Sequence, residues 1–263
     1  MIIDTHCHLD DARYTEDLDT VIARALEAGV KGIMLPGADI EDLPKAKAIA
    51  HRYPHVFYAA GVHPYHHAQY DEQVLEHYLE DEKCIAVGEC GLDYFRLPKD
   101  ELAKVEEKAA QKEVFRAHIA LATKHQKPLI VHVRESSADS FEMLNTFAAG
   151  KVPSGVLHCY NASEVLLPLA TANFYFGIGG VLTFKNEKKL GEIVTRIPQD
   201  KLVLETDAPY LTPHPKRGER NEPAYTAFVA SHLARVLAMS EEALIGLTTQ
   251  NAKALFKAFE KLD

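Results

Sequence analysis

Eight short apolar runs, separated by longer amphipathic stretches, constrain the fold of this chain more than any other feature. Each run is too short for a buried helix, and the runs are rich in Val, Ile and Phe, which is typical of strands. Nearly continuous apolar strands that alternate with helices indicate a parallel sheet covered by helices. The runs are Ile2-Ile3, Gly32–Leu35, Val56–Ala60, Cys84–Val87, Pro128–Val133, Gly155–Leu157, Phe174–Ile178 and Leu202–Leu204.

The stretches between the runs have the apolar spacing of amphipathic helices. Residues 18–26 repeat apolar positions at the helix period, and Gly29 follows as a stop signal. Eight strand-then-helix units favour an α/β fold of the (β/α)₈ TIM-barrel type, with a doubly wound open sheet as the alternative. The 263 residues match the roughly 250 of one such barrel. No linker or repeat divides the chain, so we predict a single domain over 1–263, with a polar excursion at Asp93–Glu107.

Composition and charge exclude several classes of protein. Hydrophobic residues make up 47% and charged residues 25%, which is ordinary for a globular chain. The formal net charge of −9 argues against a broad basic face that coats nucleic acid, although one phosphate can still bind in a local pocket beside a metal ion. No apolar run approaches the roughly 18 residues that span a bilayer, and no signal peptide is recognisable. Four cysteines are too few for a disulfide framework, so reduced thiols and a cytoplasmic location are expected.

Ionisable residues follow six of the eight apolar runs directly. Active sites of barrels lie at the C-terminal ends of the strands, and a charge at a buried strand end is costly unless it is paired or binds a metal. Six such residues at one end of a sheet therefore predict a site. The six strand ends read Asp4-Thr5-His6-Cys7-His8, Gly61-Val62-His63-Pro64, Gly88-Glu89-Cys90-Gly91-Leu92-Asp93-Tyr94, Val131-His132-Val133-Arg134, His158-Cys159-Tyr160-Asn161 and Glu205-Thr206-Asp207-Ala208-Pro209.

The two-residue period of a strand decides which side chains share a face. His6 and His8 share one, so both imidazoles can reach the same metal ion, while Cys7 points away. Asp4 has the same parity and is either a supporting partner of the ligands or a structural acid. The same alternation pairs Glu205 with Asp207 and His132 with Arg134, and it turns Cys90 and Cys159 away as packing residues.

The candidate ligands are imidazoles and carboxylates without thiolates, a set that suits Zn²⁺, Mn²⁺, Fe²⁺ or Ni²⁺, and Mg²⁺ where oxygen ligands dominate. Six ligands exceed the need of one catalytic ion with an open position. They fit two divalent ions about 3.5–4 Å apart that share a bridging carboxylate, for which Glu89 is the natural choice. The six are His6, His8, Glu89, His132, His158 and Asp207.

The other histidines lack this pattern. His63 ends a strand, but Pro64 follows it and no acidic neighbour is present, so substrate contact is expected rather than metal ligation. The remaining ones are expected on helices or loops, mostly facing solvent: His51, His55, His66, His67, His77, His118, His125, His214 and His232.

Taken in order, these strand-end motifs resemble those of the TatD family, which belongs to the metal-dependent hydrolases of amidohydrolase type. The segments Leu204–Leu211, Arg217–Tyr225 and Thr249–Ala252 match its pattern as well, so the resemblance covers essentially the whole chain. It implies a TIM barrel with a two-metal site and deoxyribonuclease activity, often as a 3′→5′ exonuclease on single strands. Carried over by position, one ion would be held by His6, His8, Glu89 and Asp207, and the second by Glu89, His132 and His158.

Two segments depart from the family pattern. The family usually has Phe-Ser-Gly-Ser where this chain has Tyr160-Asn161-Ala162-Ser163, a loop expected beside the site, and Arg96–Glu107 is a modest extension. The loop bears on substrate preference and leaves the ligands unaffected.

The hypothesis that follows is phosphodiester hydrolysis by metal-activated water. Asp207 acts as general base and Glu89 holds the two ions at their spacing. The net charge favours short single strands or chain ends of nucleic acid as substrate. A monomer without an obligate protein partner is expected. The residues expected to contact substrate are His63, Arg134, Glu205, Arg217 and Arg220.

Three other functions compete with this hypothesis. Hydrolysis of cyclic amides or lactones is known on related barrels, many of which carry a carbamylated Lys where this chain has Glu89. Deacylation of D-aminoacyl-tRNA is an ester hydrolysis associated with relatives of the family. A non-catalytic metal-binding or adaptor protein would have damaged ligands, whereas all six are present.

Overall fold

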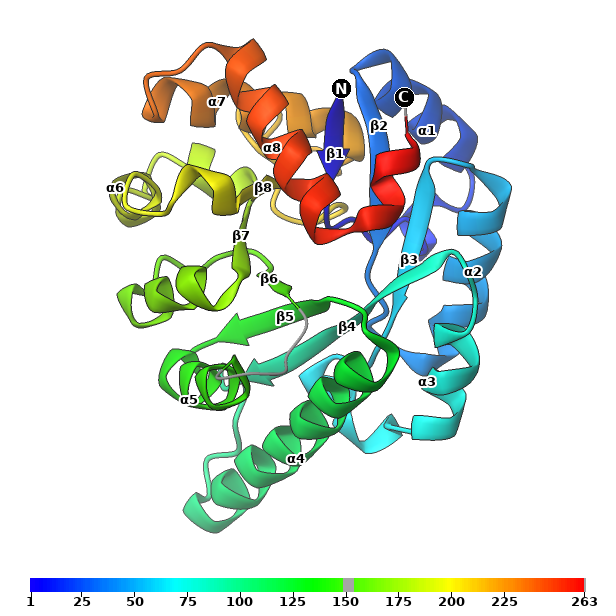
Figure 1. The fold of residues 1–263 in the computed structure, drawn as a ribbon, viewed down its shortest axis with the longest axis vertical. Helices are drawn as coiled ribbons and strands as arrows, with labels where there is room; N and C mark the ends of the chain where they lie inside the picture. Colours follow the sequence, from blue (N-terminus) through cyan, green and yellow to red (C-terminus); the bar gives the residue numbers. More distant parts are fainter. Residues whose placement is uncertain (149–153, 263) are drawn as a thin grey trace.

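The computed structural model describes residues 1–148 and 154–262. Within these residues eight parallel strands lie side by side in chain order from β1 to β8, and helices surround them (Figure 1). The predicted TIM barrel is confirmed, and each strand contains or overlaps one of the predicted apolar runs. The strands are β1 Ile2–Asp4, β2 Val30–Leu35, β3 Val56–Ala60, β4 Cys84–Asp93, β5 Leu129–Arg134, β6 Gly155–Leu157, β7 Phe174–Ile178 and β8 Leu202–Leu204.

The α-helices and one long 3₁₀ segment cover the outside of the barrel. Between β6 and β7 the connection is the 3₁₀ segment η4 (Glu164–Ala172), which contains Pro168. Proline lacks the backbone N–H that a regular α-helix needs, which accounts for the tighter winding here. The α-helices are α1 Leu18–Glu27, α2 Leu43–Arg52, α3 Glu72–Leu79, α4 Glu101–His125, α5 Ser137–Ala148, α6 Lys189–Val194, α7 Thr226–Val236 and α8 Glu241–Leu255.

The barrel closes where β1 meets β8, along a line of contacts that we call the seam, formed by residues 4–8 and 204–208. The N–H of Thr5 donates to the carbonyl of Leu204 at 3.0 Å, and the N–H of Asp207 donates to the carbonyl of His6 at 2.9 Å. The buried Asp4 carboxylate accepts from the Thr206 hydroxyl at 2.6 Å and from its N–H at 2.9 Å. Asp4 thus holds the two strand ends together. This is the second of the two roles considered for it, that of a structural acid.

Strand β4 is longer than its apolar run and extends to Asp93. The predicted excursion at Asp93–Glu107 is therefore too long, because Glu101 already begins α4. Asp100 caps this helix by accepting a hydrogen bond from the N–H of Ala103 at 2.9 Å. Only residues 94–100 form an irregular connection.

The barrel interior is divided into an apolar part and a polar part. Inward side chains such as Met34, Phe57 and Ile130 pack with Phe256 and Phe259 of the C-terminal segment, which cover the end of the barrel where the strands begin. The opposite end carries the buried ionisable residues. Among the described helices, none is both long enough and apolar enough to cross a membrane. The apolar layer leaves the C-terminal end as the place for chemistry.

Candidate metal centre

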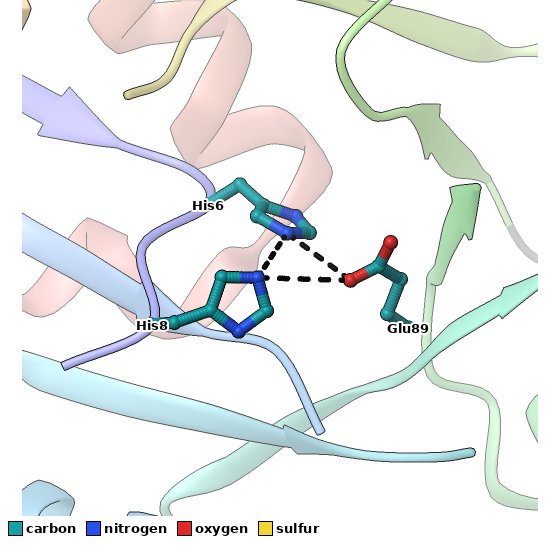
Figure 2. Close-up of side chains that lie close together, drawn as sticks. All are labelled: His6, His8 and Glu89. Carbon is teal, nitrogen blue, oxygen red and sulfur yellow. Dashed lines mark hydrogen bonds and ion pairs between the residues drawn. The ribbon is translucent and has the colours of Figure 1, made fainter. Parts of the chain in front are cut away.

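The barrel brings the six candidate ligands together at its C-terminal end. Figure 2 shows that His6 and His8 project from the segment after β1 towards Glu89, which lies on β4. His132 lies on β5, His158 directly follows β6, and Asp207 lies three residues beyond β8. Five elements of the barrel therefore contribute to one cluster.

Glu89 lies in the middle of this cluster, and its two oxygens face different imidazoles. Oε2 is 3.3 Å from His6 Nε2 and 3.8 Å from His8 Nε2. Oε1 is 2.8 Å from His132 Nδ1 and 3.6 Å from His158 Nε2. The carboxylate thus divides the cluster into two groups of nitrogen atoms and belongs to both.

Asp207 belongs to the group around Oε2 of Glu89. Its Oδ1 lies 3.6 Å from His8 Nε2 and 3.8 Å from His6 Nε2, and these two nitrogens are 3.3 Å apart. Ligand atoms that share a divalent ion at about 2.0–2.2 Å from it are separated by about 3–3.5 Å, so the spacing is close to that of a ligand set. The donor atoms are imidazole nitrogens and carboxylate oxygens, which fit a divalent metal ion.

Burial and mutual charge set the protonation of the cluster. Burial opposes the charged form of Glu89, but the neighbouring His158, His6 and His132 outweigh it and hold its pKa well below the usual value. Burial also opposes the charged form of His158, and the carboxylates of Glu205 and Glu89 outweigh it and raise the pKa of His158 to about 10. The pKa of Asp207 is shifted in the same direction as that of Glu89. It lies below the usual value despite burial because of His8, His158 and His6. The centre is thus a set of ionised carboxylates surrounded by imidazoles.

Asp93 is a member of the site that sequence reasoning did not single out. Its Oδ2 lies 2.9 Å from His132 Nε2, on the side of the ring opposite Glu89, and the residue is 1% exposed. A carboxylate behind a ligating imidazole fixes the orientation and tautomer of the ring. The signal was present in the sequence, because Asp93 has the same strand parity as Glu89 four residues earlier.

Glu205 supports His158 in the same way. One oxygen lies 3.3 Å from His158 Nδ1 and accepts a hydrogen bond from the N–H of Cys159 at 2.6 Å. Glu205 is fully buried behind the imidazole, so the substrate contact expected for it does not fit its position. Its carboxylate occupies the space left by Gly177 on β7, where a Cβ atom would lie 2.1 Å from Oε2.

His63 lies at the edge of the cluster, with Nε2 3.8 Å from Glu89 Oε1. Burial lowers the pKa of His63 to about 3, so the ring is neutral. Its Nδ1 accepts a hydrogen bond from the N–H of Tyr65 at 3.1 Å. The remaining proton is therefore on Nε2, which makes this atom a hydrogen-bond donor towards the centre.

The three candidate arginines have different surroundings. Arg134 is exposed, and its guanidinium lies 3.6 Å from the ring centroid of Phe95. Arg217 donates to the carbonyl of Thr212 at 2.9 Å, and Arg220 forms a two-point ion pair with Asp17 at 2.9 and 2.6 Å. Arg217 and Arg220 thus have structural partners, and only Arg134 is presented beside the centre.

Three cysteines of the strand-end motifs lie outside the ligand set. Cys7 and Cys90 are fully buried as packing residues, whereas Cys159 is only partly buried and borders a pocket.

His118 was expected to face solvent, and this is wrong. It is fully buried, its Nε2 accepts from the N–H of Val62 at 3.0 Å, and its Nδ1 lies 2.8 Å from the carbonyl of Val114.

A pocket of about 540 Å³ opens beside the centre. His132, His158 and Asp207 border it on the side of the centre. Tyr160, Asn161 and Ala162, from the loop that departs from the family pattern, also line it. The structure thus places this loop where it was expected, next to the site.

Comparisons with known proteins agree with these features. The family model described as TatD related DNase matches residues 3–257. The uncharacterized metal-dependent hydrolase YabD of Bacillus subtilis is 41% identical, with 98% of this chain and 99% of YabD covered. The 3′-5′ ssDNA/RNA exonuclease TatD of Salmonella typhimurium is 32% identical, with 97% and 99% covered. The crystal structure of YjjV, a TatD homolog from Escherichia coli K12, superposes with a TM-score of 0.88 at 26% identity, with 97% and 98% covered.

The agreement extends over nearly the whole chain, and the sequence motifs that resemble the family lie together at one end of the barrel. The chain belongs to the TatD family of metal-dependent hydrolases.

Proposed function

We propose that this protein is a deoxyribonuclease that removes nucleotides from the 3′ end of single-stranded DNA with two divalent metal ions. The observation that carries the proposal is the placement of Glu89, whose two oxygens face separate groups of imidazoles. A carboxylate in this position could hold two divalent ions at the spacing of about 3.5–4 Å that two-ion phosphodiesterases use. A relative with 32% identity is named a 3′-5′ ssDNA/RNA exonuclease, which supports the choice of substrate.

The proposed ligand sets share Glu89. The first consists of His6, His8, Glu89 and Asp207, and the second of Glu89, His132 and His158. When bound, divalent ions supply Lewis acidity and lower the pKa of water from about 16 towards 7. Mg²⁺, Mn²⁺ and Zn²⁺ are all compatible with imidazole and carboxylate ligands.

Asp207 is the proposed general base. Its side chain is 15% exposed, so it faces the open side of the centre, and its pKa is held low enough for the carboxylate to be ionised. An ionised carboxylate can orient the attacking water and accept its proton. Glu89 is 4% exposed at its side chain and is surrounded by imidazoles, which suits a residue that fixes spacing rather than one that exchanges protons.

Two residues of the chain are suited to hold the phosphodiester. His63 presents its Nε2 proton to the centre and can donate it to a phosphate oxygen, while the Tyr65 N–H keeps the tautomer fixed. Arg134 has a planar guanidinium that can bind two phosphate oxygens at once. Arg217 and Arg220 are held by structural partners, so we assign them no phosphate contact.

The test uses metal-stripped protein restored separately with Mg²⁺, Mn²⁺ or Zn²⁺, and a 5′-labelled single-stranded DNA oligomer. We expect a ladder that shortens from the 3′ end only in the presence of a metal ion. The Asp207→Asn variant should lose this activity by at least about a hundredfold, the lower range for removing a general base.

Asp200→Asn is the matched control, because Asp200 is an exposed carboxylate before β8, at the opposite end of the strand that leads to Asp207. It should cleave at the wild-type rate. Folded, metal-loaded protein that cleaves no oligomer with any ion would refute the nuclease assignment. Wild-type turnover by Asp207→Asn would refute the role of Asp207.

A further inference from the structure

We propose that the 540 Å³ pocket beside the centre binds the terminal nucleoside of the strand, with its base stacked on Tyr210 and its phosphate next to Arg134. This inference rests on the proposed nuclease function and deepens it by assigning where the substrate lies. The pocket falls within the range of about 300–1,000 Å³ that is usual for small-molecule sites. Because it directly borders His132, His158 and Asp207, a ligand inside it reaches the centre.

Tyr210 is the aromatic platform of the pocket. It lines the pocket although 48% of its surface is exposed, which is unusual for a large ring in a chain with few exposed aromatic residues. The Tyr210 N–H donates to the carbonyl of Asp207 at 2.8 Å, so the platform is fixed to the proposed general base. Exposed aromatic rings beside phosphate-binding groups are the usual means of holding single-stranded bases.

Arg13 supports this ring from one side. Its guanidinium carbon lies 4.4 Å from the centroid of the Tyr210 ring, and Asp11 holds the guanidinium by two hydrogen bonds of 2.8 and 2.7 Å. A cation held over one face of the ring fixes its orientation. The His8 ring also lies 6.1 Å from the Tyr210 ring in a T-shaped arrangement, and the proposed base stacks on the part of the Tyr210 ring that lines the pocket.

A second arginine–aromatic pair has its arginine in the wall of the pocket. Arg134 lines the pocket and stacks on Phe95, which is 50% exposed. Arg134 follows the proposed ligand His132 by two residues on β5. Its guanidinium is therefore placed for the phosphate next to the scissile bond, and Phe95 for a base further along the strand.

The polar groups in the pocket wall favour recognition without base preference. The Asn161 amide donates to the carbonyl of Val133 and to the Ser137 hydroxyl, both at 3.2 Å, and its oxygen accepts from the N–H of Ser163. One oxygen of Glu187 accepts from the N–H of Leu190 at 2.8 Å. Since the Asn161 amide and one oxygen of Glu187 already have partners, we expect stacking to dominate, and the four bases should bind within about threefold of one another.

The test compares ligands with and without a base. Oligomers that end in a normal or an abasic 3′ nucleotide are cleaved by the metal-loaded protein, and binding of deoxyadenosine monophosphate and deoxyribose 5-phosphate is measured separately by calorimetry. We expect the base to improve both kcat/KM and binding by about tenfold, which is within the usual contribution of one stacked base. Two ratios are compared: kcat/KM for the normal over the abasic oligomer, and affinity for deoxyadenosine monophosphate over deoxyribose 5-phosphate. Tyr210→Ala should bring both ratios close to one, and Tyr210→Phe, which keeps the ring, should preserve them.

Tyr53→Ala is the matched control. Tyr53 also has an arginine over its ring, with the Arg52 guanidinium at 5.2 Å, but it directly follows α2, at the opposite end of the barrel. Its ratios should equal those of the wild type.

The outcomes separate the two proposals. Cleavage of both oligomers at equal rates would overturn the pocket assignment and leave the nuclease function standing. Protein that cleaves neither oligomer would refute the nuclease function. The binding ratio would then decide about the pocket: equal affinities would overturn it, and a ratio that Tyr210→Ala abolishes would support it.

Discussion

His132 and Asp93 form an imidazole–carboxylate pair in which Nε2 lies 2.9 Å from Oδ2, while the other ring nitrogen faces Glu89 at 2.8 Å. The ring is thus held between two carboxylates that both come from β4. One of them belongs to the proposed ligand set, and the other lies behind the ligand. The pair defines which nitrogen of His132 is directed to a metal ion.

Removing the Asp93 carboxylate should weaken metal binding at the centre without removing a proposed ligand. We expect Asp93→Ala to lower metal affinity by about 10–100-fold, because the His132 ring loses the partner that orients it. Competition with a fluorescent chelator measures the affinity. Asp139→Ala removes a carboxylate that pairs with Lys112 and Tyr94 instead, and it should leave the affinity unchanged. Equal affinities in Asp93→Ala and wild type would contradict the role of Asp93.

Filling the space at Gly177 should disturb the centre from behind. A Cβ atom there would lie 2.1 Å from Oε2 of Glu205, so Gly177→Ala displaces the carboxylate that supports His158. We expect overpacking to lower the free energy of unfolding by about 1–3 kcal/mol and to weaken metal binding. Thermal unfolding with and without metal measures both effects. Gly191→Ala on α6 meets no atom within 4 Å and should be neutral or slightly stabilising. Unchanged metal binding in Gly177→Ala would show that Glu205 does not position His158.

His118 should make the fold sensitive to acid. Burial lowers the pKa of His118 from 6.5 to about 4, so the folded state favours the neutral ring while the unfolded chain takes up a proton. The stabilisation is fully present above pH 6.5 and is lost as the pH falls towards 4, by at most about 3 kcal/mol. Chemical denaturation between pH 7.5 and 4.5 should show a shallower decline for His118→Gln than for wild type. The exposed His77→Gln should follow the wild type, and identical slopes in all three proteins would exclude His118 as a source of the decline.

The salt dependence of DNA binding should be shallow. With a net charge of −9 and Arg134 as the arginine presented beside the centre, few phosphates are neutralised. Each phosphate contact contributes about 0.7 to the slope of log K against log salt for single strands, so Arg134→Ala should reduce the slope by about that amount. Fluorescence anisotropy in Ca²⁺, over a series of salt concentrations, measures it. A wild-type slope steeper than about 4, as for six phosphate contacts, would contradict a local phosphate site.

The strands and the proposed ligands could be predicted because both depend on local sequence. A short apolar run such as Val56–Ala60 is a strand wherever it is buried, and an imidazole directly after such a run lies at the barrel end. The extension of β4 to Asp93 was missed because its second half is polar and contains glycine, and these residues are depleted in strands.

The partners of surface residues could not be predicted in the same way. Arg220 pairs with Asp17, 203 residues earlier in the chain, and no local pattern reports which loops will meet. The surroundings of His118 likewise depend on how α4 packs against the loop after β3. Local sequence specifies elements and their polarity, whereas long-range ion pairs follow from their assembly.

The seam between β1 and β8 joins parts of the site that are synthesised at different times. His6 and His8 precede Asp207 by about 200 residues in the chain, and the hydrogen bonds of the Thr5–His8 segment run largely to residues near Asp207. A growing chain therefore contains most of the imidazoles long before it contains the carboxylate and the neighbouring strand that hold the first two in position. The proposed ligand set is therefore complete only when β1 and β8 meet at the seam.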